Sequence, residues 1–221
     1  MIDWSATGSM IAGIGTSIGA GAVIYAAHKG ADTFNEWRRQ KHHERCISLA
    51  EEILTLTYKL KRAFEGIRSP AIFAGEMSEI AEKLRESGLI DREEEPDQLL
   101  TTAQAALSRT DFHRGLFDRL LDNIPVAKAI FGDQVADQMN VFWSLRVRIT
   151  TAAHSYVRDR RSLPAGSDRQ LRQQERRERN ENILWAGGDE NGIDQFELDL
   201  VGAIAHLERF LLPILRGGNK T

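Results

Sequence analysis

One stretch near the start of the chain, Trp4–Ala27, limits what this protein can fold into more than any other. It reads WSATGSMIAGIGTSIGAGAVIYAA and contains no Asp, Glu, Lys, Arg or His. At about 1.5 Å of rise per residue, a helix of this length extends about 36 Å, whereas the hydrocarbon core of a bilayer is about 30 Å thick. The stretch therefore predicts a single transmembrane helix over residues 4–27, followed by a helical domain tethered to the membrane.

The residues on either side of this stretch predict its direction. Asp3 is the one charged side chain before it, so the basic segment that a cleavable signal peptide needs is missing and we expect the helix to be retained. Basic residues follow it at Lys29, Arg38, Arg39, Lys41 and Arg45. Because basic residues stay on the cytoplasmic side, we expect the N-terminus outside and the C-terminal domain in the cytoplasm.

Small residues recur within the stretch at a spacing of four. They are Ser9, Gly13, Ser17 and Gly21, with Gly15 and Gly19 adding a GxxxG pair. Such residues form a smooth ridge that a second helix can approach closely, which predicts self-association or pairing with another membrane protein. Two alternatives remain open: an anchor rich in Ala and Gly whose spacing arose by chance, and a soluble glycine-rich helix buried in protein.

Residues 28–45 form a charge-dense junction. Its five basic residues are candidates for contact with the membrane surface, where each contributes about 1 kcal/mol, and Phe34 and Trp37 are candidates for the interface. The alternative is an ordinary helix whose basic residues only set the topology. Gly30 either breaks or bends it. Adjacent His42 and His43 point in different directions on a helix, so we expect a solvated pair and no metal site.

Residues 46–217 predict a cytosolic helical bundle. Apolar residues keep the three-four spacing of amphipathic helices along four long stretches, which start near Cys46, Leu99, Val135 and Phe196. Pro70 and Gly132 end helices, whereas Pro125 kinks or breaks one. We expect an all-α fold: one N-terminal transmembrane helix plus an antiparallel bundle of about four long helices. Cys46 lies in phase with the first stripe, which predicts a buried thiol.

An Arg-rich segment runs from Arg158 to Arg179. It could bind anionic lipid or nucleic acid, but Glu is interleaved with Arg and aromatic residues are absent from its Arg-rich part. A solvated helical extension or a mobile segment is the preferred interpretation. The net charge of −3 adds no signal for nucleic acid.

No residue pattern here predicts a reaction. Phosphate-binding loops, zinc spacings and nucleophile elbows are absent from the sequence, so we predict no catalytic, cofactor-binding or metal-binding residues. Asp111 and His113 are two apart and do not share a helical face. His154 and His206 each lie beside an apolar neighbour, which favours partly buried, hydrogen-bonded histidines over acid–base groups.

Three short motifs and the C-terminal LLPIL carry a resemblance. The motifs are IRSPAIFAGE (Ile67–Glu76), IFGDQVADQM (Ile130–Met139) and ILWAGGDENG (Ile183–Gly192). Over about residues 46–215 the chain resembles a group of uncharacterised bacterial helical proteins, many with one N-terminal transmembrane helix. The resemblance implies an architecture and no functional residues. With the predicted direction, it implies the bacterial inner membrane.

The function expected from these features is a non-enzymatic, single-pass, membrane-anchored interaction or scaffold protein. Its expected partners are the membrane and either a second copy or another membrane protein. The first alternative is a helical-bundle enzyme or ligand-binding protein with a site between helices. The second is binding of anionic lipid or nucleic acid through residues 158–179.

Overall fold

The computed structural model is all-helical, as predicted, and describes residues 4–93, 95–161, 167–187 and 192–217. These residues form seven helices: α1 (Trp4–Ile67), α2 (Ala74–Glu86), α3 (Gln98–Phe112), α4 (Arg114–Phe131), α5 (Asp133–Arg161), α6 (Ser167–Leu184) and α7 (Gln195–Leu215).

The chain divides into two compact units, Met1–Ser48 and Leu49–Thr221. Helix α1 continues through the junction, so Gly30 does not break it. In the part of the chain that the structure describes, no helix is both long enough and apolar enough to cross a bilayer. Because the side chains of residues 4–18 lie outside that part, the transmembrane interpretation of Trp4–Ala27 stays a prediction.

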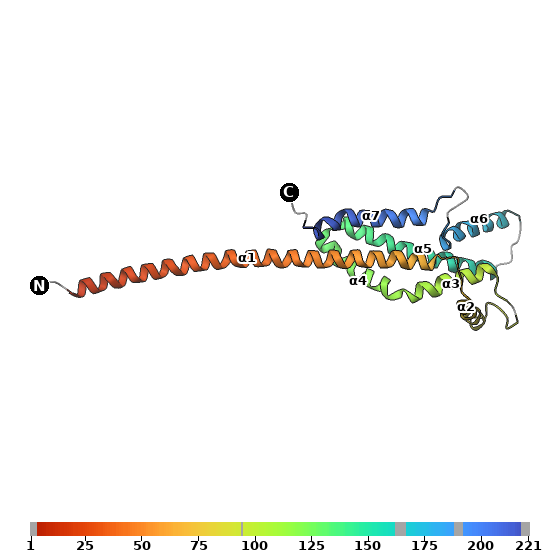
Figure 1. The fold of residues 1–221 in the computed structure, drawn as a ribbon, viewed down its shortest axis with the longest axis horizontal. Helices are drawn as coiled ribbons and strands as arrows, with labels where there is room; N and C mark the ends of the chain where they lie inside the picture. Colours follow the sequence, from red (N-terminus) through yellow and green to blue (C-terminus); the bar gives the residue numbers. More distant parts are fainter. Residues whose placement is uncertain (1–3, 94, 162–166, 188–191, 218–221) are drawn as a thin grey trace. The chain divides into compact units, whose positions relative to one another are not determined.

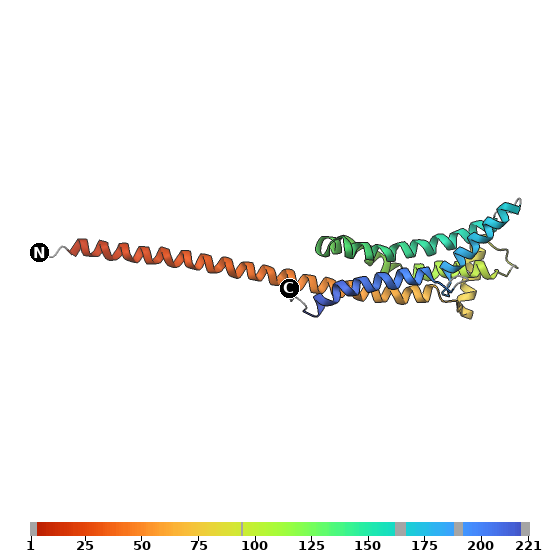
Figure 2. The same cartoon turned by 90° about the horizontal axis from the view of Figure 1, so that it is seen from above.

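The second unit is a helical bundle in which neighbouring long helices are antiparallel (Figures 1 and 2). Towards its C-terminal end, α1 contacts the start of α4 and of α7, where the Phe64 ring meets Phe117 and Phe196. Earlier on α1, Glu52 pairs with Arg119 of α4, and Tyr58 donates to Glu208 of α7 at 2.7 Å. As α1 proceeds towards its C-terminus, its contacts move towards the N-terminal ends of α4 and α7. Helix α1 is therefore antiparallel to both helices.

Phe64 marks the centre of the apolar core. Its side chain is 1% exposed, and its ring centroid lies 5.6 Å from that of Phe117 and 5.3 Å from that of Phe196, both edge-on. Edge-on pairs are favourable because the positive ring edge meets the negative face of the partner. The core then follows the predicted stripe of α5 through its buried residues Met139, Phe142, Leu145 and Ile149. A smaller cluster, which includes Ile80, Leu84 and Leu100, joins α2 to α3.

Helix boundaries follow the local chemistry of the sequence. Asp97 accepts a hydrogen bond from the Leu100 amide at 2.7 Å and caps α3, and Asp194 accepts one from the Glu197 amide at 3.1 Å and caps α7. Gly132 has φ of 85°, which suits glycine, between α4 and α5. Pro125 lies inside α4 without breaking it, so the break that we considered there is absent.

Arg68, directly after α1, ties three helix ends together. Its side chain is 3% exposed, and its guanidinium donates to the carbonyls of Ile183 at 3.0 Å, Asn182 at 2.9 Å and Trp185 at 2.6 Å. These carbonyls at the end of α6 have no partner within that helix. The same guanidinium pairs with Asp194, the cap of α7, at 2.9 Å and lies 4.3 Å from the centre of the Phe196 ring. One cation therefore compensates the ends of α6 and α7.

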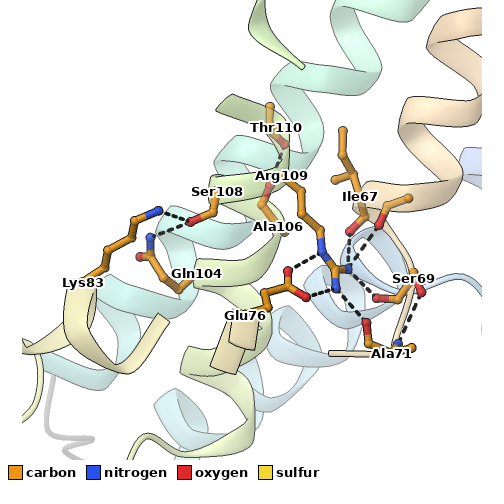
Figure 3. A network of polar contacts seen from close by, with 11 residues as sticks. Ile67, Ser69, Ala71, Glu76, Lys83, Gln104, Ala106, Ser108, Arg109 and Thr110 are labelled. Carbon is orange, nitrogen blue, oxygen red and sulfur yellow. Dashed lines mark hydrogen bonds and ion pairs between the residues drawn. The ribbon is translucent and has the colours of Figure 1, made fainter. Parts of the chain in front are cut away.

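Arg109 of α3 binds the segment that connects α1 to α2 (Figure 3). It binds the Glu76 carboxylate with two hydrogen bonds, of 2.6 and 2.8 Å, at the start of α2. It also donates to the carbonyls of Gly66 at 3.1 Å, Ser69 at 2.7 Å and Ala71 at 2.7 Å. The fork of the guanidinium suits this set because it carries five donors in one plane. Arg109 thereby fixes the segment between α1 and α2.

Replacing Glu76 with Gln should change how stability depends on pH. The hydrogen bond from Arg109 is the main reason that the Glu76 pKa lies below its ordinary value of 4.5. Since the folded pKa is lowered, the pair stabilises the fold at neutral pH, and this contribution disappears as pH falls from about 4.5 through the folded pKa. We expect E76Q to lower the free energy of unfolding by roughly 1–2 kcal/mol at pH 7. In acid, the free energies of unfolding of E76Q and of the native protein should become equal.

Urea unfolding between pH 7 and pH 3 measures this convergence. Glu79→Gln, at an exposed position on the same helix, is the matched control. If the free energies of unfolding of E76Q and of the native protein differ by the same amount at every pH in this range, the Glu76–Arg109 pair does not cause the pH dependence.

Candidate functional site

The predicted association ridge lies within α1. The side-chain surroundings of Ser9, Gly13, Gly15 and Ser17 are outside the described part of the structure. Gly19 and Gly21 are described, and both are exposed. A Cβ atom built on either would meet no atom within 4 Å. Packing inside this chain therefore does not account for the lack of a side chain at these two positions.

The five predicted membrane-surface residues, Lys29, Arg38, Arg39, Lys41 and Arg45, are all exposed on α1. Two of them form ion pairs within the helix, Arg39 with Glu36 at 3.6 Å and Lys41 with Glu44 at 2.7 Å. The hydrogen bond from Lys41 is the first reason that the pKa of Glu44 is lowered. Among the described residues, Arg38 and Arg45 have no acidic partner, so these two cations remain available to an external anion.

Two aromatic side chains lie among these cations. Phe34 and Trp37 are 58% and 54% exposed, and their ring centroids are 5.9 Å apart at an interplanar angle of 32°. Their one described stacking partner is each other. Exposed apolar groups that lie together indicate a contact surface, whereas single exposed apolar side chains are ordinary on a protein surface.

Cys46 differs from the prediction. It is half-buried, not buried, because it lies one turn before the first core residues, Leu49 and Ala50. Its Sγ atom lies 3.5 Å from His42 Nδ1. His42 and His43 are both exposed, as expected of a solvated pair. In the described part of the chain, no three His, Cys, Asp or Glu residues lie close enough together to hold a metal ion.

The remaining histidines do not converge. His154 is exposed on α5, which corrects the prediction of a partly buried residue, because it points away from the stripe that Ala152 and Ala153 bury. Partial burial lowers the pKa of His113, while Asp111 beside it is exposed. His206 is also exposed, and its Nδ1 lies 2.8 Å from the Gly202 carbonyl. Since that oxygen can only accept, Nδ1 carries the proton and Nε2 is the basic nitrogen of neutral His206.

His206 lines an open hollow of about 400 Å³ between the start of α5 and α7. Its polar lining also includes Asp137, Gln138 and Arg209, and its apolar lining includes Leu207 and Phe210. A second hollow of about 760 Å³ lies beside α2, near Glu82, Arg85 and Arg92. The first is where the ligand-binding alternative would apply, and His154 does not line it.

The Arg-rich segment, residues 158–179, is largely helical. Residues 175–179 of α6 are exposed. The side chains of residues 159–174 lie outside the described part of the structure. The end of the segment is fixed to α5, because Tyr156 donates to the Arg177 carbonyl at 2.8 Å and Asn180 donates to Ser155 at 3.1 Å. The described backbone of the segment is therefore helical, whereas the solvation of its side chains from 159 to 174 stays a prediction.

One cation escaped the analysis of the sequence. Arg146 of α5 lies 4.7 Å from the centre of the Trp143 ring and 5.2 Å from that of Phe117. Its Nε is buried and, within the described structure, has no hydrogen-bond partner. The spacing of Trp143 and Arg146, three residues apart on one helix, is the signal that indicates the first of these contacts.

Compared with protein-family models, with curated proteins and with solved structures, the chain matches none of them.

Proposed function

We propose that this protein is a non-enzymatic helical interaction protein, or scaffold, tethered to the bacterial inner membrane by one N-terminal helix. The observation that carries the proposal is the stretch Trp4–Ala27, which lacks every ionisable side chain except Tyr25. The stretch belongs to the single helix α1. The length of about 36 Å exceeds the bilayer core.

The charge distribution supports the direction of the tether. One acidic residue, Asp3, precedes the stretch, and exposed basic residues from Lys29 to Arg45 follow it. This asymmetry favours a cytoplasmic location for the bundle of the second unit.

The small-residue ridge supports association within the membrane. Helices in lipid gain little from the hydrophobic effect when they pair, so close backbone packing at small residues supplies much of the attraction. Gly19 and Gly21 are open towards the outside of α1. Because Gly19 and Gly21 are two residues apart, they lie on different sides of α1. A second copy of α1, or a helix of another membrane protein, would fit against the side that carries Gly13, Ser17 and Gly21.

Larger side chains on the ridge should abolish this association. We expect Gly13→Leu, Ser17→Leu and Gly21→Leu together to lower the signal of a helix-association reporter in the inner membrane several-fold, because leucine holds the two backbones apart. The matched control carries Ile14→Leu, Ile18→Leu and Ala22→Leu, at the same spacing but about 100° further round the helix. Equal signals from the two triple variants would remove the ridge from the proposal and leave the tether.

A further inference from the structure

The junction in residues 28–45 carries one face whose chemistry differs from the rest of α1. Phe34, Trp37, Arg38, Lys41 and Arg45 follow the three-four spacing that places residues on one side of a helix. We call these five residues the aromatic–basic face. All five are exposed, and the Phe34 and Trp37 rings stack with centroids 5.9 Å apart.

The acidic residues Glu36 and Glu44 each pair with a basic residue of the junction. Glu36 follows Phe34 by two residues and so points to the opposite side, where it pairs with Arg39 at 3.6 Å. On the face itself, Lys41 pairs with Glu44 at 2.7 Å. Within the described structure, Arg38 and Arg45 have no anionic partner. The face therefore presents two exposed rings and two uncompensated guanidinium groups.

We infer that the aromatic–basic face binds an anionic lipid surface and sets the direction in which α1 leans in the membrane. The inference rests on the proposed function, since the tether would bring the junction to the bilayer. Trp favours the interfacial layer, where its ring meets both water and lipid, and Phe buries its ring at the boundary between headgroups and acyl chains. Arg38 is suited to a lipid phosphate because a guanidinium binds phosphate through two parallel hydrogen bonds.

The dimensions fit a leaning helix. A helix of about 36 Å in a core of about 30 Å tilts, and tilts of up to about 40° occur. Phe34 and Arg38 follow Ala27 by about 10 and 16 Å along the axis, and tilting lowers both towards a headgroup layer about 5–7 Å thick. Long side chains on the lower face then reach the phosphates. Arg45, farther along, acts through the surface potential, which extends over a screening length of about 8 Å.

Charge complementarity selects lipid over other anions. The aromatic–basic face is short and lies directly beyond the uncharged stretch in the same helix. At that position, the nearest negative charges would be those of the lipids in the cytoplasmic leaflet. A zwitterionic surface offers the rings the same interface but lacks that potential. The lean should therefore require anionic lipid.

Spin labels on the full-length protein in vesicles test this inference. In a Cys46→Ser background, Phe34→Cys places a label on the face, Glu36→Cys on the opposite side, and Ile18→Cys at the centre of the tether. The readout is collision of each label with a water-soluble nickel chelate. In vesicles that contain phosphatidylglycerol, we expect the label at residue 34 to be several-fold less accessible than that at residue 36. In pure phosphatidylcholine vesicles the two should be alike.

Two neutralised variants separate the face from general basic charge. Arg38→Gln, Lys41→Gln and Arg45→Gln together should abolish the difference between residues 34 and 36, whereas Lys29→Gln with Arg39→Gln should preserve it. A label at residue 34 that is open to the chelate in both lipids overturns the inference, as does protection by added RNA in the absence of anionic lipid. The label at residue 18 reports on the tether alone. If the chelate does not reach this label, the proposed function stands even where the label at residue 34 overturns the inference. If the chelate does reach it, the proposed function is contradicted.

Discussion

Replacing Arg68 with Met should destabilise the bundle by about 3–5 kcal/mol, the cost of breaking a buried ion pair from one side. At this chain length the melting temperature should fall by roughly 6–20 °C. The methionine would fill much of the space of the arginine stem but would leave the carbonyls of Asn182, Ile183 and Trp185 without their donor. Asp194 would lose its buried partner at 2.9 Å.

The size of this effect follows from the position of the guanidinium. Arg68 is 3% exposed and Asp194 is 17% exposed, so water cannot replace the lost contacts fully. The helix ends that Arg68 satisfies belong to α6 and α7, while its own backbone carbonyl accepts from the Ala186 amide at 3.2 Å. Removing the Arg68 guanidinium therefore frees the end of α6 and the start of α7.

Urea unfolding followed by circular dichroism measures the loss. Arg62→Met, at an exposed position near the end of α1, is the matched control and should stay within about 0.5 kcal/mol of the native protein. Arg68→Lys should be intermediate, because lysine keeps the charge but not the planar fork. If R68M unfolds at the same urea concentration as R62M, Arg68 does not have this role.

Much of the fold could be predicted from the sequence because its helices follow local rules. The three-four stripes of Phe64, Met139 and Leu207 indicate helix faces that the structure buries. Asp97 and Asp194 each accept a hydrogen bond from a backbone amide three residues ahead, at the start of α3 and of α7. These features depend on neighbours within one turn, so periodicity and capping are sufficient to find them.

The two arginine clusters could not be predicted in the same way. Arg68 and Asp194 are far apart in the sequence, as are Arg109 and Glu76, and nothing local distinguishes these arginines from solvated ones such as Arg62. Their roles arise only when tertiary packing places a guanidinium beside unpaired helix ends. The exposure of His154 was also missed, because adjacent residues on a helix face different sides.

The candidate site divides along similar lines. The exposure of the five basic residues of the junction is a local property and follows from their charge. The stacking of Phe34 on Trp37 follows from their spacing of three. What α1 pairs with is a property of a second molecule, so no pattern in one chain determines it.

Charges placed in the centre of the tether should release the protein from the membrane. Ile11, Ile14, Ile18, Val23 and Ile24 each favour insertion by about 0.3–0.6 kcal/mol, whereas a lysine at the helix centre costs about 2.5–3.5 kcal/mol. Ile14→Lys with Ile18→Lys therefore outweighs the whole apolar contribution of the stretch. Thr33→Lys with Gln40→Lys adds the same charge to the junction, outside the tether, and should leave insertion unchanged.

Alkaline extraction of membranes from cells that produce the full chain is the most direct test of the tether. The native protein and the junction control should remain in the membrane pellet, and the Ile14→Lys, Ile18→Lys variant should move to the supernatant with its helical circular dichroism preserved. Native protein that leaves the membrane as completely as this variant would contradict the tether, and with it the proposed function.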